Sequence, residues 1–467
     1  MEAGAEFPHT EYCLQKQTIY GMIQITKLLQ QEDDPMKNPL KVVLVGAGSR
    51  ADRYASESLY HPEKLKVVGI VDPDPVRREL IREKYSVDPG NCFDTVEEFV
   101  QRDKFADAVI NGTMDHLHVS TSIPVLDKGY DLLLEKPFAL NPDQVRQLQD
   151  AAERNGSKVV ICHVLRYTPF YSAIKDAILS GELGKIISIE MSEHVCYHHM
   201  AASFVRGKWR SEKLCQAPML LAKSCHDMDI MLWMMQQTKP VAISSFGSES
   251  IYGSNRKPEG AGTRCMVDCP YVDSCMYSAK GNYLPYPRWA AYVWKILEGQ
   301  GELTPEMKAE SLRTDNPYGK CVWDFERDGN VDHQTVIVNF ANGATGSFNM
   351  IGGAMRSQRS IHIIGTEGEL TGIFEDSRYV IRKSAPDADY GYVETEYDLN
   401  IQGDMIGQRG GHGGGEPRLV HDFIDYLNGS EKSVSCATLD ESVISHLAVF
   451  KAEQARKTGT VVTMDGV

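Results

Sequence analysis

Short, mostly apolar runs alternate with longer mixed stretches over residues 41–163. The apolar runs are 42–45, 66–71, 106–111, 131–134 and 158–163. Such runs predict strands that are buried on both faces of a sheet. The stretches between them predict helices, at 77–85, 96–102, 118–128 and 141–155 among others. This alternation predicts a doubly wound parallel sheet, and so an α/β domain over residues 36–167.

The pattern changes after Pro169. A strand at 185–194 and a helix at 223–235 are followed by strands at 336–340, 346–350 and 360–364, and by closing helices at 419–427 and 441–457. Strands in succession are typical of antiparallel sheets. We therefore expect a C-terminal α+β domain over residues 168–467 with a large, mostly antiparallel open sheet. It carries a cysteine-bearing insertion at about 253–330, and residues 1–35 form an N-terminal extension.

Composition narrows the class of protein. The chain has 467 residues, of which 42% are hydrophobic and 24% charged, and a formal net charge of −15. These values suit two globular domains, and the absence of a basic cluster argues against nucleic acid or an anionic membrane as a partner. No apolar stretch approaches about 18 residues and no secretory signal is evident, so we expect a cytoplasmic protein.

The first apolar run leads directly into Gly46-Ala47-Gly48-Ser49-Arg50-Ala51. This is the G-x-G-x-x-A dinucleotide fingerprint, in its required place between a strand and a helix. Glycines allow the backbone to approach the pyrophosphate, which binds at the helix N-terminus. We expect Gly46, Gly48, Ser49 and Arg50 to contact the cofactor of a Rossmann domain.

Asp72 ends the second apolar run. A carboxylate at this position accepts hydrogen bonds from the adenosine ribose and repels a 2′-phosphate, so NAD is favoured over NADP. Arg77, included in the predicted cofactor site, could accommodate the phosphate instead, as could Arg50 or Arg78.

Polar residues follow the strand that ends at Asn111. Together with Asn111, the side chains of Thr113, Asp115 and His118 lie at the carboxyl edge of the predicted sheet, where open α/β sheets bind ligands. We expect them to line the nicotinamide side. Helix capping by Thr113 or Asp115 is the alternative.

Glu135-Lys136-Pro137 follows the strand 131–134. With the fingerprint, Asp72 and the later Cys225-His226-Asp227-Met228-Asp229, it makes the chain resemble the glucose-fructose oxidoreductase and inositol dehydrogenase family, Gfo/Idh/MocA, over roughly residues 38–460. The resemblance implies that Lys136 lies beside the nicotinamide and the reacting carbinol, with Glu135 in the cofactor site. A lysine ammonium there can stabilise alkoxide character on a sugar hydroxyl. A surface salt bridge between Glu135 and Lys136 is the alternative.

The resemblance also implies that His226 faces the substrate and shares the hydroxyl proton with the lysine. Asp229, three residues later on the predicted helix, could orient the imidazole. A core histidine is the alternative. Many members carry an aspartate four residues before this histidine, where this chain has Ala222. Either Lys223 replaces it as a second cationic contact, or the chemistry is a variant.

Two further segments are candidates for the site. His163-Val164-Leu165-Arg166 resembles the family's linker between domains, in which Arg166 approaches the cofactor. A loop with His412 among five glycines suits a lid over a polyhydroxylated ligand, as in members that act on glycosides. A plain surface turn is the alternative for the loop.

Cysteines are unusually frequent in this chain. Cys265, Cys269 and Cys275 lie within eleven residues, and Cys321 could supply a fourth thiolate. Four thiolates suit a closed structural zinc site, with an iron–sulfur cluster or unligated reduced cysteines as alternatives. A second group at 194–199 contains three histidines and Cys196, and a sugar-contacting strand end or an exposed loop is favoured there over a metal.

The leading hypothesis is hydride transfer between NAD and a secondary hydroxyl of a sugar or glycoside. A second is a redox-neutral glycosidase that oxidises the sugar transiently, eliminates the aglycone and returns the hydride. A third is a non-catalytic dinucleotide-binding regulator, against which Lys136 and His226 count. We also expect a homo-oligomer, a dimer or tetramer, since the open sheet commonly pairs in the family.

Overall fold

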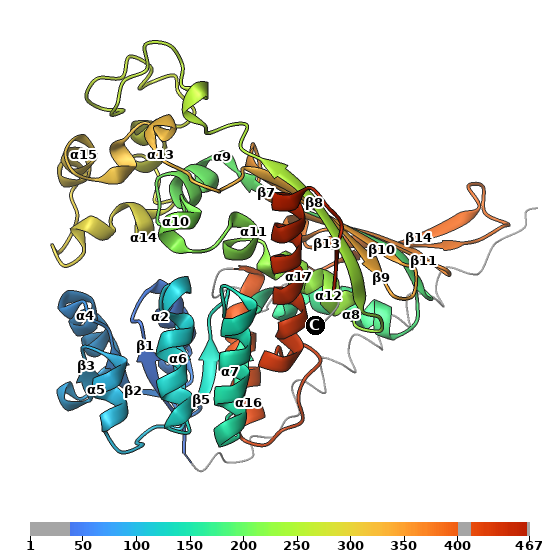
Figure 1. The fold of residues 1–467 in the computed structure, drawn as a ribbon, viewed down its shortest axis with the longest axis horizontal. Coiled ribbons are helices and arrows are strands. Elements are labelled where there is room, and N and C mark those ends of the chain that lie inside the picture. Colours follow the sequence, from blue (N-terminus) through green and yellow to red (C-terminus); the bar gives the residue numbers. More distant parts are fainter. Residues whose placement is uncertain (1–37, 400–411, 465–467) are drawn as a thin grey trace, which may run out of the picture.

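The computed structural model describes residues 38–399 and 412–464, which form two sheets with their helices (Figure 1). The first sheet is entirely parallel, with strand order β3-β2-β1-β4-β5-β6. This is the predicted doubly wound sheet. Its strands are β1 Leu40–Val45, β2 Leu65–Val71, β3 Cys92–Phe93, β4 Ala108–Asn111, β5 Asp131–Leu134 and β6 Val159–Ile161.

Helices cover both faces of this sheet and bury one apolar cluster on each side. They are α2 Ser49–Ala55, α3 Glu57–Tyr60, α4 Pro75–Tyr85, α5 Val96–Gln101, α6 His118–Asp127 and α7 Pro142–Asn155. Local signals set several ends: the Asp74 side chain caps α4, the Asn141 side chain caps α7, and Gly156 ends α7 in the left-handed conformation.

The second sheet has strand order β14-β13-β12-β11-β7-β10-β9-β8-β15. Only β7 and β10 pair in parallel, so the predicted mostly antiparallel sheet is confirmed. Its strands are β7 Ile186–Cys196, β8 Pro240–Ser248, β9 His333–Phe340, β10 Thr345–Ala354, β11 Gln358–Gly365, β12 Glu369–Ile373, β13 Arg378–Ser384, β14 Tyr392–Asp398 and β15 Val462–Thr463.

One face of the second sheet is covered by helices that build the largest apolar core of the protein (Figure 1). These helices are α8 Pro169–Leu179, α11 Met219–Ala222, α12 Cys225–Met234 and α17 Leu439–Thr458. Short helices lead into them, namely α9 Tyr197–His199 and α10 Glu212–Cys215. The candidate functional site lies where this layer of helices meets the first sheet.

The last helices cross back between the layers. Helix α16, Gly415–Leu427, lies in the predicted C-terminal domain, yet its Leu419 and Phe423 pack into the core of the parallel sheet. Helix α17 contacts β8, α12 and α7, and thus both domains. Helix α16 therefore crosses the domain boundary predicted at residue 167, because its apolar stripe fits the sheet face beside α2.

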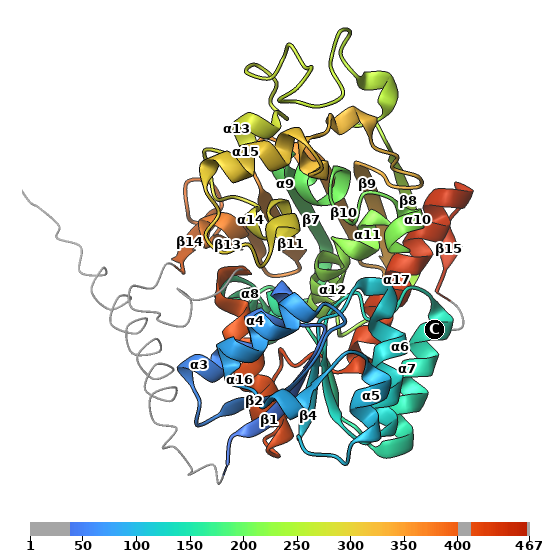
Figure 2. The same cartoon turned by 90° about the vertical axis from the view of Figure 1, so that its left-hand side faces the viewer.

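Residues 249–332 connect the neighbouring antiparallel strands β8 and β9. This segment, called here the insertion, contains α13 Ala279–Tyr283, α14 Ala290–Val293 and α15 Pro305–Arg313 and has its own small apolar core. In Figures 1 and 2 it extends from the second sheet toward α4 of the first domain. Glu298 of the insertion pairs with Arg77 of α4 at 3.1 Å, which confirms the contact.

Candidate active site between the two domains

The fingerprint forms the tight turn that the glycines predict. Gly46 has φ +76°, and a Cβ added there would lie 2.8 Å from the Thr113 backbone nitrogen. Gly48 is the N-cap of α2, with only the Gly112 carbonyl as close as 4.0 Å to an added Cβ. The start of α2, with Ser49 as its first residue, is thus open to a group with the bulk and charge of a pyrophosphate.

A substitution at Gly46 tests this turn. We expect Gly46→Ala to cost about 1–3 kcal/mol of stability, because both the positive φ and the contact with Thr113 penalise a side chain. Dinucleotide affinity, measured by quenching of protein fluorescence, should fall by at least tenfold. Gly129→Ala, also at positive φ but in open space, is the matched control and should retain affinity. Equal losses in both variants would contradict the role of the turn.

Asp72 lies at the carboxyl end of β2 and is 4% exposed. Its Oδ2 accepts a hydrogen bond from Ala47 N–H at 2.9 Å, which fixes the carboxylate beside the fingerprint. Arg77 Nη1 lies 3.5 Å from Oδ1. The Arg50 guanidinium has other partners than Asp72, because it donates to Glu135 at 2.6 Å and to Glu416 at 3.2 Å.

The residues after β4 form one hydrogen-bonded loop. Asn111 is buried, accepts from the Thr113 hydroxyl at 2.8 Å and donates to Thr121 at 2.8 Å. The two ring nitrogens of His118 lie 2.7 Å from the Pro137 carbonyl oxygen and 3.2 Å from that of Thr113. Asp115 accepts from Trp209 Nε1 at 2.9 Å. No side chain caps α6, so helix capping does not explain these residues.

Glu135 is 4% exposed, and its carboxylate accepts from Arg50, from the Tyr54 hydroxyl at 2.6 Å and from Lys136 N–H at 2.9 Å. Burial raises the pKa of this carboxyl, but the Arg50 and Lys136 charges outweigh it and lower the pKa to about 2. The surface salt bridge considered above is therefore excluded. Glu135 is a buried anion that holds Arg50 at the start of α2.

Lys136 follows, joined to Pro137 by a cis peptide bond. Its Nζ donates to the Ala222 carbonyl oxygen at 3.0 Å, at the C-terminus of α11. His226, 4% exposed, lies in the first turn of α12, which begins three residues beyond Ala222. Lys136 and His226 thus both lie where the parallel sheet borders the second domain.

His163, in the linker between the domains, is also buried here. Its ring lies 5.9 Å from that of His226, centroid to centroid, in a T-shaped arrangement. Burial lowers the pKa of His163 to about 4, and Lys136 acts in the same direction. His163 is therefore neutral near pH 7. Within the described part of the chain, neither ring nitrogen has a hydrogen-bond partner.

Two sequence profiles match the chain in line with this architecture. Residues 40–163 match the oxidoreductase family with NAD-binding Rossmann fold, Gfo/Idh/MocA, and residues 175–464 match its C-terminal alpha/beta domain. The chain belongs to this family. The predicted resemblance is confirmed over almost all of the described residues.

Individual Gfo/Idh/MocA proteins agree with the assignment. The oxidoreductase YteT of Bacillus subtilis is 27% identical over 436 residues, covering 89% of this chain and 97% of that protein. Glucose-6-phosphate 3-dehydrogenase of the same organism is 25% identical over 175 residues, which are 37% of this chain and 46% of that enzyme. An Agrobacterium radiobacter oxidoreductase solved with NAD+, L-tartaric acid and magnesium shares the fold, with TM-score 0.62, 14% identity and coverage of 91% and 98%.

In this Gfo/Idh/MocA chain, the Asp229 carboxylate pairs with a different residue from the one that the sequence predicts. Its two oxygens accept from Arg166 Nε and Nη2, each at 2.7 Å, and both residues are buried. Burial opposes ionisation, but the charge and hydrogen bonds of Arg166 outweigh it and lower the pKa of Asp229. The predicted acid partner of His226 is thus the counter-ion of Arg166, because α12 directs Asp229 toward the linker. Arg166 in turn fastens the linker to α12.

Lys223 also has a partner that the sequence did not reveal. Its Nζ lies 2.7 Å from Glu193 on β7, which also accepts from Ser224 and from Arg359 of β11. Arg359 Nε donates to Asp227 at 2.8 Å. The four charged groups form a buried network directly beside α12. Burial raises the pKa of Asp227, and the neighbouring Glu193 carboxylate acts in the same direction.

The insertion supplies residues that sequence reasoning missed. Trp289 stacks on His199 with ring centroids 4.2 Å apart, and its Nε1 donates to His198 at 2.9 Å. The Tyr292 ring lies 6.2 Å from that of Trp289, centroid to centroid, and burial raises the pKa of its hydroxyl. The histidines after β7 therefore belong to an aromatic wall, formed by His199, Trp289 and Tyr292. Their sequence spacing gave no sign of this wall, since Trp289 is about 90 residues away.

The glycine loop returns to the same region. Residues 400–411 lie outside the described residues, as does the side chain of the predicted His412. Gly415 lies so close to the linker that an added Cβ would be 2.4 Å from the Val164 carbonyl oxygen. Gly413 and Gly414 have positive φ, as the composition suggests. The end of the loop therefore lies beside the segment that carries His163 and Arg166.

All four predicted metal-binding cysteines line one cavity in the insertion. However, no three of their sulfur atoms lie within 4.8 Å of one another. Tetrahedral zinc with Zn–S bonds of about 2.3 Å needs sulfurs about 3.8 Å apart. The predicted zinc is therefore not supported by this spacing.

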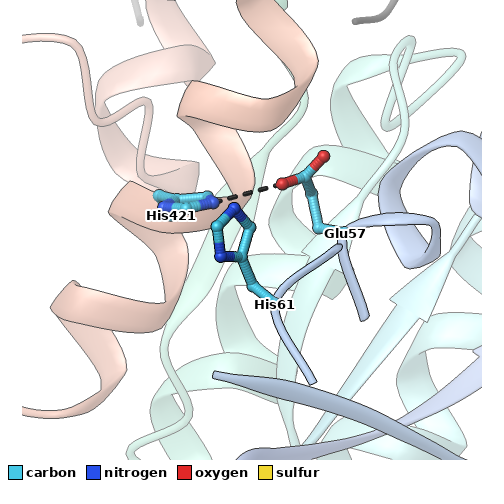
Figure 3. Close-up of side chains that lie close together, drawn as sticks. All are labelled: Glu57, His61 and His421. Carbon is cyan, nitrogen blue, oxygen red and sulfur yellow. Dashed lines mark hydrogen bonds and ion pairs between the residues drawn. The ribbon is translucent and has the colours of Figure 1, made fainter. Parts of the chain in front are cut away.

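A different group of ligand-type side chains lies where α16 docks on the first domain (Figure 3). His421 Nε2 is 3.2 Å from Glu57 Oε2, and the His61 ring meets the His421 ring edge-on at 4.9 Å. Glu57 and His61 precede β2, at the edge of the sheet opposite the fingerprint. We therefore associate this group with the docking of α16 rather than with the active site.

Among the residues that the structure describes, we find no helix with the length and hydrophobicity that a membrane span requires.

Proposed function

We propose that this Gfo/Idh/MocA protein transfers a hydride between NAD and a secondary hydroxyl of a sugar or glycoside. The observation that carries the proposal is the position of Lys136 at the carboxyl edge of the NAD-binding sheet, where the carbonyl of Ala222 holds it just before the helix that carries buried His226. The sugar dehydrogenases among the relatives support the substrate class, although the matched regions span less than half of their length.

Bound NAD would supply the hydride acceptor, and the residues of this chain would manage the proton. An ammonium has three N–H donors, and the Ala222 carbonyl engages one of those of Lys136. The others are available to a substrate hydroxyl, whose developing negative charge they would stabilise. His226 would accept the proton as general base. His163, which is neutral, would add no second positive charge beside Lys136.

The aromatic wall of the insertion supports a carbohydrate substrate. Flat aromatic rings pack well against the C–H faces of a pyranose, and Trp289, Tyr292 and His199 form such a group of rings. Selectivity for the sugar would thus depend on the insertion, and proton transfer on the core domains.

A redox-neutral glycosidase is the second candidate, favoured by Ala222. A backbone carbonyl replaces the carboxylate of many dehydrogenase members and cannot accept a proton at neutral pH. Elimination of an aglycone after oxidation needs a base for the carbon acid next to the new carbonyl. Asp227 lies on α12 directly after His226, and Arg359 links it to Glu193. The charges of this buried network would therefore influence such a base.

One assay distinguishes the two candidates. Purified protein is incubated with a panel of sugars and aryl glycosides, with and without added NAD, while absorbance at 340 nm and aglycone release are followed together. Stoichiometric NADH without aglycone supports the dehydrogenase. Catalytic aglycone release without net NADH supports the glycosidase, and neither signal with any substrate contradicts both.

Cofactor choice depends on Asp72 and Arg77. We expect Asp72→Ser to raise kcat/KM with NADP relative to NAD by at least about tenfold, because it removes the charge that repels a 2′-phosphate and removes one of the three carboxylates that pair with Arg77. The measurement is the ratio of the two kcat/KM values. Asp74→Ser, which removes another partner of Arg77, is the control and should leave the ratio within about twofold. An unchanged ratio in Asp72→Ser would show that the carboxylate does not face the ribose.

We propose a homo-oligomer that pairs through the uncovered face of the second sheet. Phe246 of β8 is 67% exposed, and Ile337 of β9 and Ile351 of β10 are also exposed on neighbouring strands. Light scattering should give a mass of two or four chains, and Phe246→Glu should shift it to one chain or raise the dissociation constant at least tenfold. Leu80→Glu, at an exposed apolar residue of α4, is the control. A monomeric wild-type protein would contradict the proposal.

A further inference from the structure

The cavity in the insertion, called here the cysteine cavity, has a volume of about 230 Å³. That is many times the space that one water molecule or one metal ion occupies. Besides its cysteines, its lining is largely apolar and aromatic. The lining includes Cys265, Cys269, Cys275, Cys321, Tyr277, Trp323 and Arg206. Four cysteines from two separate segments thus surround a single space.

Backbone pairing holds the two segments together. Cys265 N–H donates to the Gly319 carbonyl and Cys321 N–H donates to the Thr263 carbonyl, each at 2.9 Å. These bonds place Cys265 and Cys321 on adjacent strands of a short bridge. Each of the four cysteines is nevertheless a free thiol, so disulfides do not explain their convergence.

Hydrogen-bond donors point at the sulfur atoms. Tyr277 N–H donates to Cys275 Sγ at 3.4 Å, and Arg206 Nη2 lies 3.7 Å from Cys265 Sγ. Donors to sulfur stabilise thiolates and are the usual environment of metal-bound cysteine.

Arg206 adds a charge that requires a partner. It is 1% exposed, and its guanidinium donates to the Lys320 and Tyr277 carbonyls and to the Tyr283 hydroxyl. No carboxylate in the described part of the chain pairs with it. Burying a cation without a counter-ion is unfavourable. An anionic group in the cavity would remove that cost, and thiolates bound to a cluster carry net negative charge.

We propose that the four cysteines of this cavity bind a cubane iron–sulfur cluster that fastens the insertion to the second domain. The four ligand sulfurs of a cubane lie on different iron atoms and stand about 6 Å apart, so they enclose the cluster. That arrangement fits both the empty volume between the cysteines and the separation of their sulfurs beyond the reach of one tetrahedral ion. Arg206, which follows the segment 200–205 behind His199, would then tie the cluster to the wall of the active site.

The cluster would have a structural role. The same insertion carries Trp289 and Tyr292 of the aromatic wall and Glu298 against Arg77. Fixing the fold of the insertion would fix these contacts with the first domain and with the histidines after β7. No redox step of the cluster is needed for that effect, and the proposal does not depend on the identity of the sugar.

The test is elemental analysis of the full chain purified without oxygen. We expect about four irons and four acid-labile sulfides per chain, with a broad absorption near 400 nm that dithionite bleaches. One zinc per chain without iron or sulfide would overturn the proposal, as would metal-free protein that takes up no cluster when treated with ferric iron and sulfide under a thiol reductant, which supplies the two electrons that a [4Fe–4S]2+ cluster requires.

Variants add a second readout. Cys269→Ser and Cys321→Ser should lose at least half of the iron and the 400 nm band, whereas Cys92→Ser, in β3 of the first domain, should keep both. Equal iron content in all three variants would overturn the assignment of the ligands. The wild-type analysis decides the proposal even where a variant fails to fold.

Discussion

Replacing Lys136 with methionine is expected to lower kcat/KM for the sugar about 10³-fold. The ammonium is the charge placed to stabilise a developing alkoxide, and loss of one such donor or proton-transfer group costs about 10²–10⁴ in rate. Methionine keeps the length of the side chain and removes its charge and its bond to the Ala222 carbonyl. Steady-state kinetics with the best substrate of the panel give the measurement.

Two observations separate this effect from damage to the fold. NAD affinity and the melting temperature of Lys136→Met should stay close to those of the wild type, because the side chain is only partly buried and forms a single hydrogen bond. Lys158→Met is the matched control, since this lysine also donates to one carbonyl and lies outside the site. Less than a tenfold loss in Lys136→Met would contradict the role of the lysine.

Replacing Asp229 with alanine is expected to destabilise the protein by about 3–5 kcal/mol, because it leaves the buried Arg166 guanidinium without its counter-ion. For a chain of 467 residues, we expect a fall in melting temperature of roughly 3–5 °C. Differential scanning calorimetry gives the measurement. The same variant tests whether Asp229 orients His226, as the sequence suggested, or holds the linker on α12.

The double replacement Arg166→Met with Asp229→Leu distinguishes the two roles. Removing both charges should restore at least half of the lost stability, since well-packed apolar residues often replace a buried ion pair without loss. If Asp229 instead acts on His226, Asp229→Ala should retain its melting temperature and lose activity. That result would contradict the structural assignment.

Sequence reasoning located the parallel sheet because its strands are buried on both faces and therefore read as apolar runs. It missed β3, whose two residues are too short to form a pattern, and also β8 and β12–β14, whose outward positions are polar or exposed. The docking of α16 on the first domain was hidden as well. An apolar stripe shows that a helix is covered but not which sheet covers it.

In the active site, the residues tied to strand ends were predictable. Asp72, Asn111 and Lys136 lie where parallel strands end at one edge, so the fold alone brings them together. Partners from distant elements were not predictable. Helical spacing predicted that Asp229 orients His226. In the structure, both oxygens of Asp229 accept hydrogen bonds from the linker residue Arg166. Glu193, Arg359 and Trp289 come from β7, β11 and the insertion, and no local pattern connects them.

Single-turnover transfer of deuterium tests the central claim most directly. Enzyme in excess is mixed with NAD and a perdeuterated sugar or glycoside that is active in the panel, quenched, and the nicotinamide is analysed by mass spectrometry. If a hydride passes from a sugar carbon to NAD, the reduced cofactor should carry one deuterium, and Lys136→Met should form it about 10³-fold more slowly. Turnover of the sugar without deuterium in the reduced cofactor would contradict the account.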